Sequence, residues 1–162
     1  MFFSNMMVQF FMALAASVSF AVLYNAPKEE LLFSGLSGAA GWVVYLIVSE
    51  QTGDGGVFAY VIATIALTLL SRILAVIRRY PVTVYLTVSI FPLVPGIGIY
   101  YTVYYLINKQ NELFAARGLA TFEAAAGIAF GIAAAFAIPQ KWFTMFECRK
   151  KEDYQESERG QR

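Results

Sequence analysis

Phe91-Pro92-Leu93-Val94-Pro95-Gly96-Ile97-Gly98 interrupts an uncharged run that extends from Tyr80 to Asn108. Proline lacks the N–H that a helix interior needs and clashes with the preceding turn, and glycine lets the backbone leave helical geometry. A bilayer tolerates unwound backbone only where it is buried in protein or lines a cavity. The segment therefore predicts a discontinuous membrane helix, a feature from which transporters build substrate sites near the middle of the membrane. The alternative interpretation is a packing kink, which is common in long helices.

Long uncharged blocks dominate the rest of the chain. Of its 162 residues, 59% are hydrophobic and 14% are charged, whereas a soluble domain carries about 25% charged residues. A spanning helix needs roughly 20 apolar residues, and five uncharged runs reach or approach this length: 1–27, 31–49, 55–71, 80–108 and 124–140. We therefore predict an all-α integral membrane protein, a bundle of about five transmembrane helices with one broken at Pro92-Gly98. The bundle is expected over residues 1–140 and a polar cytoplasmic tail over residues 141–162.

The broken segment has the length of a complete span. The expected elements are helices over about 6–24, 30–48, 57–77 and 118–138, half-helices over 81–91 and 98–108, and a loop over 108–117. Each half-helix has 11 residues and is about 16 Å long at 1.5 Å per residue. Together they approach the ~30 Å thickness of the hydrocarbon core. We therefore expect the two halves to cross the membrane in series.

Basic residues set the expected orientation. If the broken segment spans, one side of the membrane receives ten basic residues: Lys28, Arg72, Arg78, Arg79, Lys141, Arg149, Lys150, Lys151, Arg159 and Arg162. The other side receives only Lys109 and Arg117. Cytoplasmic loops carry the excess of Lys and Arg, whereas a re-entrant segment would remove most of this bias. We expect a plasma-membrane protein with its N-terminus outside and its C-terminus in the cytoplasm.

Several kinds of chemistry are excluded by composition. The sequence has no histidine and a single cysteine, Cys148, which removes His-based zinc sites, Ser-His-Asp triads and disulfide frameworks together. No acidic residues cluster within the apolar blocks, so a pair of general acid–base groups is missing. We expect no enzymatic activity, no catalytic residue, no metal, no cofactor and no nucleic-acid partner.

The break supplies the candidate substrate site. The second half-helix begins near Ile97-Gly98, where its unpaired N–H groups and positive dipole end favour an anion such as a carboxylate. The first half ends near Phe91 with free carbonyls, which suit a cation or an ammonium group. The candidate substrate-binding residues are Pro92, Pro95, Gly96, Gly98, Thr87 and Tyr101. For the last two, the alternatives are a bond from Thr to its own helix and an interfacial belt of Tyr.

Two ionisable residues and two pairs of glycines complete the candidates. Arg72 and Glu123 are expected within or near the membrane, where ionisable groups are functional candidates for coupling or gating. Both are also close enough to the ends of their helices to reach the interface. Small residues allow close helix contact, and we assign helix packing, within the chain or with a partner, to Gly38, Gly41, Gly127 and Gly131.

Three parts of the sequence together resemble a known family: Pro92-Leu93-Val94-Pro95-Gly96, Gly38-Ala39-Ala40-Gly41-Trp42, and the Ala/Gly-rich last helix. The chain looks like a member of the threonine/serine exporter family, specifically the small membrane subunit that corresponds to the C-terminal half of the full-length exporter. The resemblance covers nearly the whole chain. It implies secondary export of threonine and serine or, as in two-subunit members, of small dicarboxylates such as succinate. It also implies a second membrane subunit of the same family that bears the other half.

Two hypotheses for function follow. In the first, the chain is a subunit of a secondary transporter that exports small carboxylate-bearing metabolites. In the second, it is a non-transporting assembly or scaffold subunit that stabilises a partner through its small-residue faces. Besides the lipid bilayer, we expect the second membrane subunit as a partner, with a homo-oligomer as a further possibility. Reconstitution of the chain alone and with its partner would separate the two hypotheses.

The predicted orientation can be checked by cysteine labelling. A Gly53→Cys variant in a Cys148→Ser background should react with a membrane-impermeant thiol reagent added to intact cells, because its loop is expected outside. Native Cys148 should not react from that side. Protection of position 53 together with labelling of Cys148 would overturn the orientation.

Overall fold

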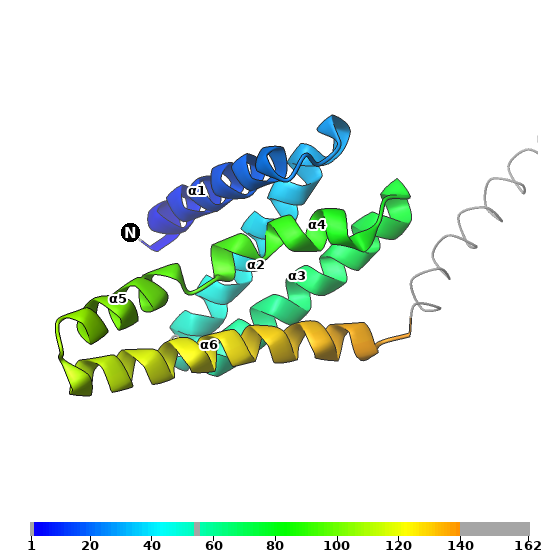
Figure 1. Cartoon of the computed structure of the whole chain (residues 1–162). Coiled ribbons are helices and arrows are strands. Elements are labelled where there is room, and N and C mark those ends of the chain that lie inside the picture. Colours follow the sequence, from blue (N-terminus) through cyan, green and yellow to red (C-terminus); the bar gives the residue numbers. More distant parts are fainter. Residues whose placement is uncertain (1, 54–55, 140–162) are drawn as a thin grey trace, which may run out of the picture.

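The computed structural model describes residues 2–53 and 56–139, and these residues form helices joined by short turns (Figure 1). The elements are α1 (Phe2–Leu23), η1 (Lys28–Glu30), α2 (Leu31–Thr52), α3 (Val57–Arg78), α4 (Val82–Ser89), η2 (Phe91–Leu93), α5 (Gly96–Ile107) and α6 (Asn111–Ala137). The predicted all-helical class is confirmed. The expected tail over 141–162 lies outside the described residues.

Four of these helices are long and apolar enough to cross a membrane, namely α1, α2 with η1, α3 and α6. The fifth candidate span is the pair formed by Val82–Leu93 and Gly96–Ile107, which is bent by 52° at the break. A bend of this size leaves the two halves running in the same general direction, as Figure 1 shows for α4 and α5. The described part of the chain thus has four to five candidate spans, with the break at the predicted place.

The prediction of a loop over 108–117 is wrong. The structure has a turn at Asn108–Gln110, where Lys109 adopts a positive φ of 55°, and α6 begins at Asn111. The segment that follows contains Glu, Leu, Ala and Arg, which are strong helix formers. The last helix therefore continues through these polar residues instead of beginning after them. Charged residues indicate where a helix leaves the apolar part of the membrane, but they do not indicate where the helix itself begins or ends.

Helix α2 lies at the centre of the molecule and packs against α1, α3 and α4. Its small residues make these contacts possible. A Cβ added at Gly38 would overlap the hydroxyl of Ser17 on α1, and one added at Gly41 would lie 2.9 Å from Leu67 Cβ on α3. The two glycines therefore let neighbouring helices approach the α2 backbone directly.

Helix α6 packs along α3 through the other pair of glycines. A Cβ at Gly127 would lie 3.0 Å from Val57 Cγ1, and a Cβ at Gly131 would lie 2.9 Å from Thr64 Cβ and from the carbonyl oxygen of Val61. Gly127 and Gly131 are both buried. This small-residue face is therefore occupied within the chain.

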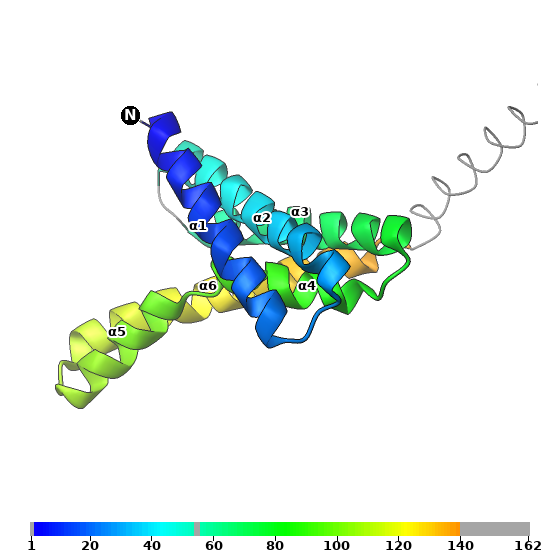
Figure 2. The same ribbon diagram turned by 90° about the horizontal axis from the view of Figure 1, so that it is seen from above.

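The pair formed by α5 and the first half of α6 stands apart from the other helices (Figure 2). Helix α5 packs on α6, with no comparable contact to another described element, and none of its residues is buried. The core lies elsewhere, around Ala63, Leu67, Leu93 and Ile128. The break therefore sits where a packed bundle meets a two-helix extension.

The contact between α3 and α6 predicts a position-specific stability defect. Gly131→Leu should destabilise the purified protein by about 1–3 kcal/mol or more, because the side chain would push against backbone and Thr64. Ala133→Leu, an exposed position on the same helix, should have little effect. Thermal unfolding in detergent, followed by circular dichroism, measures both. Equal stability of the two variants would contradict the close α3–α6 contact.

Candidate functional site

The break is held in place by contacts of the residues around it. Helix α4 ends at Ser89, the 3-10 turn Phe91–Leu93 follows, and Val94 is extended before α5 begins at Gly96. The Phe91 ring stacks on Phe20 of α1 with centroids 3.9 Å apart, and Leu93 is buried in the core. These two side chains anchor the unwound backbone on both sides of Pro92.

Two backbone donors remain unpaired at the start of α5. The N–H of Gly96 donates to the Val94 carbonyl at 2.7 Å, and the N–H of Ile99 donates to the Pro95 carbonyl at 3.0 Å. Between them, the N–H groups of Ile97 and Gly98 have no acceptor among the described residues. These donors sit at the positive end of the helix dipole, where an anion is stabilised.

A cavity of about 490 Å³ opens beside these donors. Its wall includes every residue of the break: Pro92, Leu93, Val94, Pro95, Gly96, Ile97 and Gly98. The opposite wall comes from α2, α3 and α6: Trp42, Tyr60, Arg117, Ala120, Thr121 and Ala124. Among these lining residues Arg117 is the only charged one, and none is acidic. The cavity therefore combines one cation with unpaired backbone donors.

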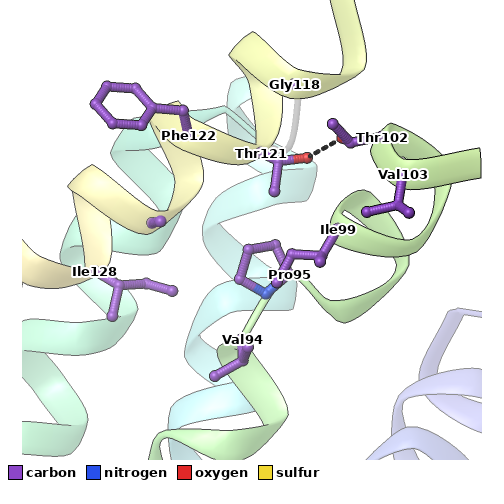
Figure 3. Close-up of a pocket in the computed structure, with 10 residues that line it drawn as sticks. Val94, Pro95, Ile99, Thr102, Val103, Gly118, Thr121, Phe122 and Ile128 are labelled. Carbon is purple, nitrogen blue, oxygen red and sulfur yellow. Dashed lines mark hydrogen bonds between the residues drawn. The ribbon is translucent and has the colours of Figure 1, made fainter. Parts of the chain in front are cut away.

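A second, apolar cavity of about 420 Å³ flanks the same contact between α5 and α6 (Figure 3). It shares Val94, Pro95 and Thr121 with the first cavity. Its two threonines are satisfied locally, because Thr102 donates to the Gly98 carbonyl at 2.7 Å and Thr121 donates to the Arg117 carbonyl at 2.7 Å. Nothing in this lining favours a polar ligand, so the first cavity is the candidate site for one.

The structure brings some of the predicted site residues together and leaves others outside. Pro92, Pro95, Gly96 and Gly98 all line the first cavity. In contrast, Thr87 and Tyr101 are exposed on the outer faces of α4 and α5 and line neither cavity. Glu123 is likewise exposed and lines neither cavity.

Gly96 and Gly98 differ in their surroundings. A Cβ at Gly96 would meet nothing within 4 Å, whereas a Cβ at Gly98 would lie 2.5 Å from Thr121 Oγ1 on α6. Gly98 is thus a point of close approach between α5 and α6. Gly96 borders open space in the cavity.

The side chain of Arg72, which belongs to α3, reaches the C-terminal end of α6. Its side chain is 4% exposed, and Nη1 donates to the carbonyl oxygen of Ala135 at 2.6 Å. Its guanidinium also lies 5.6 Å from the centre of the Phe136 ring. The last four carbonyls of a helix lack intrahelical partners, and a cation there is stabilised by the dipole. Arg72 therefore caps α6 and joins it to α3.

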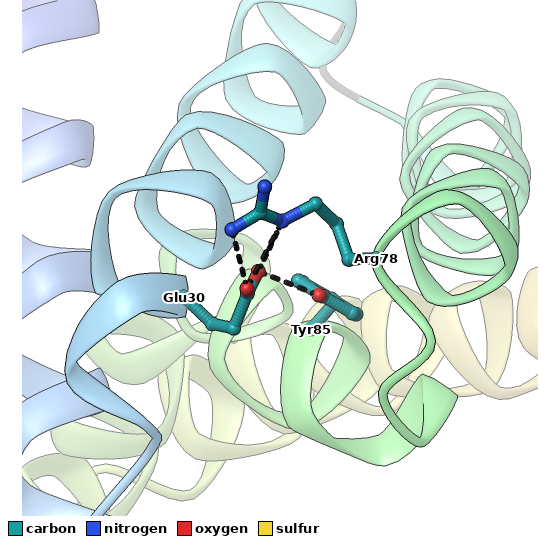
Figure 4. Close-up of polar contacts among 3 residues, drawn as sticks. All are labelled: Glu30, Arg78 and Tyr85. Atoms are coloured by element: carbon teal, nitrogen blue, oxygen red, sulfur yellow. Dashed lines mark hydrogen bonds and ion pairs between the residues drawn. The ribbon is translucent and has the colours of Figure 1, made fainter.

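The sequence did not predict a cluster of charged and polar side chains that forms around a buried carboxylate (Figure 4). Glu30 is fully buried; Arg78 Nη2 donates to its Oε1 at 2.7 Å, and the Tyr85 hydroxyl donates to its Oε2 at 2.7 Å. We call these three residues the Glu30 cluster. The signal was available, because an acid before one span and a base at the end of the next, antiparallel span lie at the same membrane face.

A bundle of apolar helices with one discontinuous span and a cavity at its break defines a multi-pass membrane protein of the transport class. The family model described as "Threonine/Serine exporter, ThrE" matches residues 9–138. This match covers well over half of the chain, which therefore belongs to the threonine/serine exporter family, a family of transporters and not of enzymes. No curated protein and no solved structure gives a match.

The different surroundings of Gly96 and Gly98 predict different effects on folding. Gly96→Leu should leave the thermal stability of the purified protein unchanged, because its side chain would enter open space. Gly98→Leu should lower it, because α5 and α6 would have to separate at Thr121. Unfolding curves in detergent compare the two directly. A stability loss in Gly96→Leu as large as in Gly98→Leu would contradict the open cavity.

Proposed function

We propose that the chain is a subunit of a secondary transporter that exports small carboxylate-bearing metabolites, threonine and serine or a dicarboxylate such as succinate. The observation that carries this proposal is the cavity at the break, which is lined by Arg117 and by Ile97 and Gly98, whose N–H groups have no acceptor among the described residues. Membership of the exporter family supports the transport of such substrates.

In the proposed mechanism, the backbone donors of α5 and the side chain of Arg117 bind the carboxylate. Backbone N–H groups at a helix start fix the position of an anion, and the guanidinium offers a planar pair of donors that matches a carboxylate. Trp42 and Tyr60 provide the apolar wall for the rest of the molecule. Gly96 leaves the space into which the substrate fits.

A partner subunit is part of the proposal. Helix α5 has no buried residue, and it exposes large apolar side chains that include Ile97, Tyr100 and Ile107. The α5–α6 pair stands away from the bundle in Figure 2, and among the described elements α5 packs mainly against α6. We propose that a second membrane subunit of the family completes the site from this side, in the plasma membrane, with the N-terminus outside and the C-terminus in the cytoplasm.

Efflux from reconstituted vesicles tests the function. Reconstituted with its partner, the chain should export labelled threonine, serine or succinate, whereas the chain alone should export much less. Arg117→Gln should weaken the apparent affinity about 10- to 100-fold, since a hydrogen bond to a charged group contributes about 1.5–3 kcal/mol and 1.4 kcal/mol is tenfold. Gly96→Leu should abolish efflux, because it would fill the cavity.

Matched variants control for general effects. Lys109→Gln removes one cation from the exposed turn before α6, and Ala126→Leu adds a bulky side chain at an exposed position of α6. Both should retain wild-type efflux. Normal export by Gly96→Leu and Arg117→Gln would refute the site. A chain that restores its partner's efflux even with both substitutions would instead be the assembly or scaffold subunit.

A further inference from the structure

Buried polar residues connect the cavity at the break to the Glu30 cluster. On α2 and the turn before it, Trp42, Gly38, Ser34 and Glu30 recur every four residues and so share one face. Trp42 lines the cavity, Ser34 is fully buried, and Glu30 belongs to the cluster. One face of this helix therefore has polar or small residues along its length between the cavity and the Glu30 cluster.

Helices α3 and α4 repeat this arrangement. On α4, Ser89 lies between Leu93 at the cavity and Tyr85 in the cluster. On α3, three hydroxyl residues lie between Tyr60 at the cavity and Arg78 in the cluster; they are Thr64, Thr68 and Ser71. These hydroxyl side chains and those of Ser34, Ser37 and Ser89 are all fully buried. We call the interface of Ser34, Ser37, Thr68, Ser71 and Ser89 between α2, α3 and α4 the polar interface; Thr64 packs against Gly131 of α6 instead.

The hydroxyls of the polar interface are not all satisfied. Ser37 and Ser71 bond each other across the interface at 3.4 Å, and Ser89 donates to the carbonyl of its own helix at Tyr85. In contrast, the buried hydroxyls of Ser34 and Thr68 have no hydrogen-bond partner among the described residues. A hydroxyl without a partner is unfavourable in an apolar interior, where an alanine would pack without this cost. Hydroxyls without a protein partner are better suited to a surface that is exposed to water in another conformation of the protein.

The Glu30 cluster closes this interface at its far end. It joins the start of α2, the end of α3 and the first turns of α4. The carboxylate of Glu30 is fully buried, while the side chain of Arg78 is 34% exposed, so the cluster lies where the interior meets the surroundings. An ion pair is well suited to a contact that has to open and close, because the two charges regain their hydration when they separate and water enters, and this hydration offsets the loss of their attraction.

We propose that the polar interface is the inner half of the transport path in its closed state, and that the Glu30 cluster is the gate that closes it. The proposal rests on the proposed transport function. When the gate opens, α2 separates from α3 and α4, and water reaches the hydroxyls between the cluster and the cavity. Glu30 and Arg78 are gating residues that do not bind substrate.

Cysteine accessibility tests the gate without a transport measurement. In a Cys148→Ser background, Ser37→Cys reports on the polar interface, with a small membrane-impermeant methanethiosulfonate added from either side of sealed vesicles. Adding Glu30→Gln should raise the reaction rate at least tenfold from the side on which Arg78 lies. Glu29→Gln, the same charge change at the exposed neighbouring residue, should leave the rate unchanged.

A second reporter separates gating from general loosening. Ala39→Cys is fully buried on α2, two residues from Ser37 and on another face, and it should stay unreactive in every variant. Tyr85→Phe removes only one hydroxyl from the cluster and should raise the rate at Ser37→Cys to a smaller extent. This variant keeps the test decisive if Glu30→Gln fails to fold.

Three results would overturn the gate: no rate increase, an equal increase with Glu29→Gln, or an equal increase at Ala39→Cys. Failure of the gate and failure of the proposed function remain distinguishable. Continued efflux with unchanged accessibility refutes the gate and leaves the transport proposal standing. Increased accessibility in a chain that exports none of the tested substrates supports the gate and removes the proposed substrate class.

Discussion

In the hydrocarbon core of a bilayer, a backbone N–H or C=O without a partner costs several kcal/mol, and the structure around the break is arranged by this constraint. Pro92 and Pro95 carry no N–H, so the unwound stretch has fewer donors to satisfy. Short-range bonds satisfy others, such as Leu93 N–H to the Ile90 carbonyl at 2.9 Å and Val94 N–H to the Phe91 carbonyl at 3.2 Å. The donors that remain, at Ile97 and Gly98, are those that border the cavity.

The same constraint explains why helix α6 has to lie against the break. Unwound backbone must be covered by protein or face a cavity, and α6 contributes Arg117, Ala120, Thr121 and Ala124 to the cavity wall. Gly98 permits this close approach, since the hydroxyl of Thr121 occupies the space that a Cβ would need. The 52° bend then carries α5 away from α1, α2 and α3, which leaves α5 with α6 as its main neighbour.

The sequence was sufficient to predict the features that depend on composition along the chain. The uncharged runs located the spans, and four helix breakers within Pro92-Gly98 located the discontinuity. The sequence was insufficient for features that depend on whether a helix face points into the bundle or away from it. Thr83 and Thr87 share one face of α4 by spacing, but spacing does not say whether that face points inward, and both residues are exposed.

Contacts between residues far apart in the sequence could not be predicted, for a related reason. In the sequence, Glu30 is an acid at the start of a predicted span, where the helix dipole favours it, and Arg78 is one of the ten basic residues on the expected cytoplasmic side. Their contact depends on the register between neighbouring helices, and the phenol of Tyr85 completes the cluster from a third element. Arg117 was counted only as a charge outside the membrane, because its helix was expected to begin one residue later, at Gly118.

The polar interior of this bundle is not explained by stability. Replacing a buried ion pair with apolar side chains of similar volume is often neutral or stabilising. The hydroxyls of Ser34 and Thr68, which find no partner among the described residues, weaken the closed packing further. Helix contacts in membranes need only small residues and good packing, which Gly38, Gly41, Gly127 and Gly131 already supply. The polar residues between the cavity and the Glu30 cluster therefore lower the cost of separating α2 from α3 and α4. An interface that separates and closes again is what a membrane transporter requires of its helices.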